Sequence, residues 1–81
     1  MRNQNRRVEV DTRAFERSNG GRLPRGRGRF LFTTEDPDRT LDLDFALVIE
    51  PPHAYATFTE CRSNAAGVAR GRGADRVFVL P

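Results

Sequence analysis

The strongest constraint on the fold is the alternation in the segment LDLDFALVIE, residues 41–50. Every odd-numbered position in it is apolar, and three of the five even-numbered positions are acidic. A helix would scatter the five apolar side chains around its axis, whereas a strand places them on a single face. The pattern therefore predicts a strand with one buried face. Pro51 and Pro52 cannot donate to a sheet, so we expect the strand to end before them.

Three further segments have the composition of strands. Residues 8–14 alternate between small or apolar and charged side chains, and residues 29–34 and 76–80 are rich in Phe and Val. The last of these is apolar on both faces, which is typical of a strand inside a sheet. We expect 29–34 to form a hairpin with 41–50 through a turn at 35–39.

One helix is predicted over residues 58–71. Thr57 and Glu60 have the spacing of a capping box, and the apolar residues that follow fall on one face of a helix. Cys61 lies on this face, so we expect it in the core. Gly71 or Gly73 is expected to end the helix.

These elements predict a small two-layer α+β domain, in which one helix lies across a four-stranded sheet and the order along the chain is β-β-β-α-β. The 81 residues leave no room for a second core. We expect residues 1–7 to be a flexible basic N-terminus and residues 8–81 to be the single domain. The segment 16–28 is rich in Gly, with Pro24 and Asn19, and predicts a loop.

The composition excludes several kinds of protein. A single cysteine rules out an internal disulfide and a cysteine-based zinc site, and it favours a reducing, cytoplasmic location. The N-terminus lacks the apolar stretch of a signal peptide. The longest apolar run, residues 45–49, is too short for a membrane helix, so we expect no membrane association.

The sequence also lacks the patterns of a catalytic or cofactor site. Gly26-Arg-Gly28 and Gly71-Arg-Gly73 begin like a dinucleotide fingerprint but lack its remaining glycine and its strand–helix context. The acidic residues that begin at Asp36 do not have the register of a calcium-binding loop. We therefore expect no enzyme, no cofactor and no metal.

Charge is distributed unevenly along the chain. All fourteen basic residues are Arg. Residues 1–30 carry nine Arg and three acids, net +6; residues 31–60 carry one and seven, net −6; residues 61–81 carry four and one, net +3. Such segregation indicates either internal neutralisation or a surface with two differently charged faces.

Two groups of arginines are the candidate binding residues. The loop has four, with no acid between Glu16 and Glu35, and the end of the helix has two: Arg22, Arg25, Arg27, Arg29, Arg70 and Arg72. Guanidinium groups bind phosphates and carboxylates through paired hydrogen bonds. The first hypothesis is therefore a non-enzymatic protein that contacts nucleic-acid phosphates. The alternative is an inhibitor or adaptor that binds an acidic or nucleic-acid-binding surface of a protein complex.

The segments FERSNGGRLPRGRGRFLF and TFTECRSNAAGVARGRGADRVFVLP resemble short proteins of bacterial plasmids and phages. The resemblance covers residues 15–81. It consists of a Pro24-Arg25-Gly26 loop, an aromatic strand, a capped Ala-rich helix and a terminal Val-rich strand. It implies a mobile-element protein that binds nucleic acid or a host protein complex, for example to block a defence system. A homodimer is compatible with so small a domain.

Overall fold

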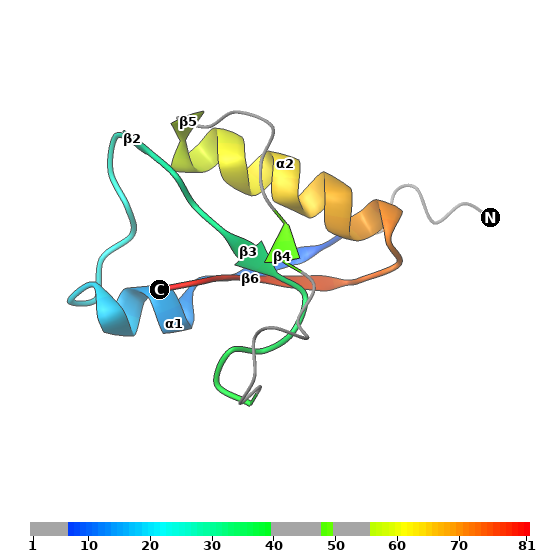
Figure 1. Ribbon diagram of the computed structural model, residues 1–81, viewed down its shortest axis with the longest axis horizontal. Helices are drawn as coiled ribbons and strands as arrows, with labels where there is room; N and C mark the ends of the chain where they lie inside the picture. The colour runs from blue at the N-terminus through cyan, green and yellow to red at the C-terminus, as the bar shows by residue number, and fades with distance from the viewer. Residues whose placement is uncertain (1–6, 40–47, 50–55) are drawn as a thin grey trace.

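The computed structural model describes residues 7–39, 48–49 and 56–81 (Figure 1). Within these ranges the chain forms two helices and six short strands. Their order is β1 (Glu9–Asp11), α1 (Arg13–Ser18), β2 (Arg27–Gly28), β3 (Phe32–Thr33), β4 (Val48–Ile49), β5 (Ala56–Thr57), α2 (Phe58–Gly71) and β6 (Arg76–Val79). This mixture confirms the predicted α+β class.

The strands belong to two separate sheets. The main sheet has the order β1-β6-β3-β4, in which β6 runs parallel to β1 and antiparallel to β3. A two-stranded antiparallel ribbon joins β2 to β5. Helix α2 lies across the main sheet, and the ribbon lies at the N-terminal end of this helix (Figure 1). As the composition of residues 76–80 indicated, β6 is an interior strand.

The predicted single sheet with one helix is wrong in its details. The predicted strand 8–14 ends at Asp11, and α1 begins two residues later. The backbone N–H of Arg13 donates to the Asp11 carboxylate at 3.0 Å, so the chain turns into a helix there. Of the predicted strand 29–34, only Phe32 and Thr33 join the main sheet. The predicted loop 16–28 is also shorter than expected, because residues 16–18 belong to α1, and Arg27 and Gly28 pair with β5.

The predicted hairpin is confirmed where the structure describes both of its strands. Phe32 pairs with Ile49 and Thr33 with Val48 in antiparallel register. The other residues of the predicted strand, 41–47 and 50, lie outside the described residues, as do residues 1–6 of the predicted flexible N-terminus.

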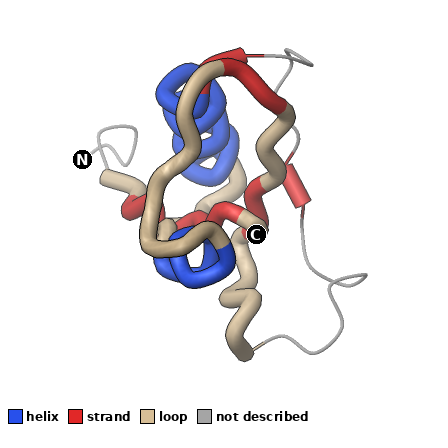
Figure 2. Tube along the Cα trace, turned by 90° about the vertical axis from the view of Figure 1, so that its left-hand side faces the viewer, coloured by secondary structure: helices blue, strands red, loops and turns tan. Residues whose placement is uncertain are grey.

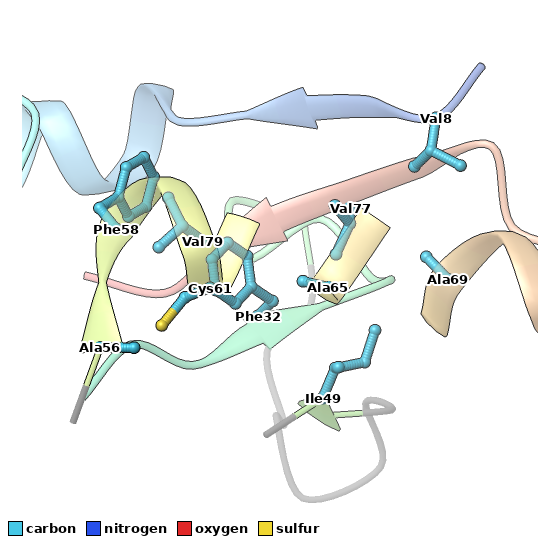
Figure 3. Close-up of a cluster of buried hydrophobic side chains, with 10 residues drawn as sticks. All are labelled: Val8, Phe32, Ile49, Ala56, Phe58, Cys61, Ala65, Ala69, Val77 and Val79. Carbon is cyan, nitrogen blue, oxygen red and sulfur yellow. The ribbon is translucent and has the colours of Figure 1, made fainter. Parts of the chain in front are cut away.

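The hydrophobic core fills the space between α2 and the main sheet (Figure 3). Val77 and Val79 of β6 are fully buried there, as are Phe32 of β3 and Ala65 and Ala69 of α2. Cys61 is only 1% exposed and belongs to the same cluster, which confirms its predicted place in the core.

Both ends of α2 are capped as the sequence predicted. Thr57 Oγ1 accepts a hydrogen bond from the Glu60 backbone N–H, and the Glu60 carboxylate accepts one from the Thr57 N–H. At the other end Gly73 has a φ of +83°, and the N–H of the following Ala74 donates to the Ala69 carbonyl at 2.9 Å. These caps therefore fix the two ends of α2, so its boundaries do not depend on the intrinsic helix propensity of its residues.

None of the helices in the part of the chain that the structure describes is long and apolar enough to cross a membrane.

Candidate nucleic-acid interface

The arginine-rich loop, residues 19–29, connects α1 to the β2–β5 ribbon. Figure 2 shows it as an arc that rises from α1 toward the start of α2. Gly20, Gly21 and Gly26 have φ values of 66°, 80° and 70°, which other residues rarely adopt, so the sharp bends of the loop require glycine. The Asn19 side-chain amide also donates to the Arg22 carbonyl at 3.1 Å.

The far end of the loop is fixed to the first turn of α2. Arg27 pairs with Thr57 across the small ribbon, and the Phe30 ring packs edge-on against Phe58 with 5.4 Å between centroids. A Cβ atom on Gly28 would lie 3.1 Å from the tip of the Phe30 ring, so glycine permits this close packing. The loop is thus held by structured elements at both ends.

All four loop arginines are exposed. Within the described ranges the guanidinium groups of Arg22 and Arg25 form no salt bridge. The salt bridges between described residues instead join Arg13 to Asp11, Arg17 to Asp38 and Arg76 to Glu9. Part of the acidic charge is therefore neutralised by arginines outside the loop.

Asp11 and Arg13, which form one of these salt bridges, have shifted pKa values. Arg13 Nε donates to both Asp11 carboxylate oxygens, at 3.0 and 3.2 Å, and Asp11 is only 7% exposed. The hydrogen bond from Arg13 holds the pKa of Asp11 at about 2, against an ordinary value of 3.8, even though burial opposes the shift. The same pair raises the pKa of Arg13. It stabilises the junction of β1 and α1, from which the loop departs.

The six predicted site residues do not gather in one patch. Arg22, Arg25, Arg27 and Arg29 follow one another along the loop, which ends beside the first turn of α2. Arg70 and Arg72 lie at the other end of this 14-residue helix, about 21 Å away along its axis (Figure 1). A cation is also favourable at a helix C-terminus without any ligand. The loop is therefore the better candidate, and the helix end is a separate basic site.

Sequence reasoning missed a groove beside the loop. It has a volume of about 200 Å³ and is lined by Phe15, Arg29, Phe30, Leu31, Leu80 and Pro81. These residues come from α1, the segment before β3 and the end of the chain, so no local pattern in the sequence predicts it. Leu31, on its wall, is 38% exposed, and Leu23, in the loop, is 46% exposed.

A larger polar groove of about 650 Å³ lies between α1, the turn at 34–39 and β6. Arg17 and Asp38 form a hydrogen-bonded pair across it, and the Arg76 guanidinium lies 5.9 Å from the centre of the Phe78 ring while pairing with Glu9. The groove is lined by acids as well as arginines, so it suits a polyanion less than the loop does.

The other residues that the sequence singled out have structural roles. Phe32 is fully buried and stacks on Phe58 at 6.1 Å, so its ring is not a surface for a ligand. Burial raises the pKa of the Cys61 thiol, which disfavours the thiolate that a nucleophile needs.

The fold and the loop define a small α+β protein with an exposed cationic segment. Comparisons of the chain found no matching family model, no matching curated protein and no matching solved structure.

Proposed function

We propose that this is a non-enzymatic binding protein whose loop 19–29 engages nucleic acid through phosphate contacts. The supporting observation is that four exposed arginines lie on a loop held at both ends, and that two of them, Arg22 and Arg25, form no salt bridge within the described ranges. The proposal includes the setting expected from the sequence: a plasmid or phage protein, as the resemblance implies, in the cytoplasm, as the single cysteine favours.

The chemistry of the loop suits a polyanion. Each guanidinium can donate two parallel hydrogen bonds to the oxygens of one phosphate. Because the ribbon and α1 restrain the loop, less conformational entropy is lost on binding than a free arginine-rich tail would lose. Phosphate contacts position a protein but do not distinguish bases, so sequence preference should be weak.

A protein partner is the second candidate. The observation in its favour is that two well-exposed leucines accompany the arginines: Leu23 lies within the loop and Leu31 follows Arg29 by two residues. Apolar side chains next to arginines are common at protein interfaces. On this alternative the protein is an inhibitor or adaptor, and the loop binds an acidic surface of a host complex.

The test compares two double variants that remove the same charge. Arg22→Gln/Arg25→Gln changes the loop, and Arg70→Gln/Arg72→Gln changes the end of α2. Binding to a fluorescent random-sequence DNA is measured by anisotropy at low salt. We expect the loop variant to bind about tenfold more weakly or worse, since each lost hydrogen bond to a charged group contributes roughly 1.5 kcal/mol or more, and the helix-end variant to bind nearly as the wild type.

Two results would contradict the proposal. Equal losses in both variants would mean that net charge, and not the loop, holds the DNA. If the wild type binds neither duplex nor single-stranded DNA at low salt, but captures a protein partner that the loop variant loses, then the adaptor function is correct.

A further inference from the structure

At the end of the loop, Arg29 lies next to apolar side chains. Arg29 forms one wall of the groove, and the other five lining residues are apolar. The rings of Phe15 and Phe30 are partly exposed, and Leu31 is 38% exposed. The remaining loop arginines precede Arg29 within seven residues of the chain. The groove therefore has one arginine on its wall and an arginine-rich segment directly before that residue in the chain.

This combination distinguishes between two forms of nucleic acid. A duplex presents phosphates on its outside and keeps the apolar faces of its bases stacked inside, so the groove would gain nothing from it. A single strand exposes both phosphates and base faces, and proteins that bind it combine a positive surface with apolar or aromatic side chains that contact bases. The groove has an arginine on its wall beside apolar side chains, which is the combination that binding of a single strand requires.

We propose that the loop and the groove together bind single-stranded nucleic acid, with phosphates on the loop arginines and one unstacked base against Phe30 and Leu31. This rests on the proposed function and specifies its substrate class. The base adds affinity through burial of its face and needs no hydrogen bond to its edge, so any base is accepted. The Phe30 ring is held in place for this role by its edge-on contact with the Phe58 ring, at 5.4 Å between centroids.

The positive charge near the groove favours single-stranded nucleic acid as its ligand. Arg29 lies on the wall of the groove, and Arg22 and Arg25, on the segment that leads to it, are exposed and form no salt bridge within the described ranges. A strand of nucleic acid carries one phosphate per nucleotide and satisfies both features at once. An acidic peptide with apolar residues is the competing occupant, and the experiment below includes it.

The experiment measures the affinity of the intact protein for four probes at low salt by anisotropy. They are a dT oligomer, a duplex of equal length, an abasic oligomer with the same number of phosphates, and a peptide of alternating Asp and Leu with the same charge. We expect the dT oligomer to bind at least fivefold more tightly than the abasic one, because contact with a base contributes roughly 1 kcal/mol or more. The dT oligomer should also bind more tightly than the duplex, although the duplex carries more phosphates.

Two matched variants test the groove itself. Leu31→Ser alters its wall, and Leu23→Ser alters a similarly exposed leucine of loop 19–29 that does not line it. Both side chains lie outside the hydrophobic core, so the fold should tolerate either change. We expect Leu31→Ser to remove the preference for dT over the abasic oligomer and Leu23→Ser to leave that preference intact.

The outcomes separate this inference from the function on which it rests. Equal binding of the dT and abasic oligomers, or tighter binding of the duplex, would overturn the single-strand proposal and leave the phosphate-binding function standing. Tighter binding of the acidic peptide than of dT would overturn it in favour of a protein ligand. If no nucleic-acid probe binds, the proposed function fails as well.

Discussion

Replacement of Asp11 by Asn tests the electrostatic account of the junction between β1 and α1. The Asp11 carboxylate is nearly buried and accepts hydrogen bonds from the backbone and side-chain nitrogens of Arg13. Its pKa falls from 3.8 to about 2 on folding. That difference corresponds to about 2 kcal/mol of stability, since one pKa unit is 1.36 kcal/mol.

The sign of the effect follows from the direction of the shift. Because the folded-state pKa lies below the unfolded value, the ionised carboxylate stabilises the folded protein fully above about pH 5. This contribution is lost as the pH falls from there through about 2. Arg76 adds a smaller attraction in the same direction.

The assay is urea unfolding of the wild type and Asp11→Asn at pH 7 and pH 2.5. At pH 7 the variant should be less stable by about 2 kcal/mol. The gap should narrow at pH 2.5, because this pH lies well below the unfolded pKa of 3.8 and close to the folded pKa of about 2, so most of the stabilisation is lost. Other acids titrate in both proteins and cancel in the comparison. A gap that is equal at the two pH values would refute the reasoning, because it would mean that Asp11 acts through its shape and not through its charge.

Two further predictions concern α2. A bulky thiol reagent should label Cys61 far more slowly in the native protein than in urea, because the thiol is 1% exposed and burial raises its pKa; rapid native labelling would place Cys61 outside the core. Gly67→Ala should stabilise the protein by roughly 0.5–1 kcal/mol, since Gly67 is inside the helix with open space around its Cβ position. Gly73→Ala should destabilise it by roughly 1–2 kcal/mol, because φ there is +83°. Thermal unfolding measures the effect of each glycine substitution on stability. Changes of the same sign would contradict the role of Gly73 in ending α2.

The elements that the sequence predicts well are those specified by nearby residues. The spacing of Thr57 and Glu60 marks the start of α2, and the glycine at 73 marks its end. The apolar run of residues 77–80 identifies β6 as an interior strand. In each case a local rule and the tertiary packing favour the same structure.

The sequence-based predictions are wrong where a local pattern fits more than one secondary structure, or where residues distant in the sequence determine the structure. The alternation of side chains in 8–14 continues past Asp11, so it does not show where the strand ends. Helix α1 begins at Arg13, and the side chain of its N-cap residue, Thr12, forms no capping hydrogen bond. The β2–β5 ribbon has two residues per strand, too few to show a period. The groove combines side chains from three segments, so only the fold brings Phe15 next to Leu80.

The distribution of the arginines was partly predictable. The loop cluster follows directly from the sequence, but Arg70 and Arg72 were grouped with it on charge alone. The length of α2 separates them, since the loop ends at the first turn and these two arginines lie at the last. Charge along a sequence therefore identifies candidate residues, whereas the fold decides which of them act together.

The salt dependence of binding to a dT oligomer tests the central claim most directly. If the four loop arginines each neutralise one phosphate, a plot of log affinity against log salt should have a slope of about −3, since each contact to a single strand contributes about −0.7. The variant Arg22→Gln/Arg25→Gln/Arg27→Gln/Arg29→Gln should remain folded by circular dichroism and should bind weakly with a slope near zero. A folded variant that keeps the wild-type slope and affinity would show that the loop does not hold the nucleic acid.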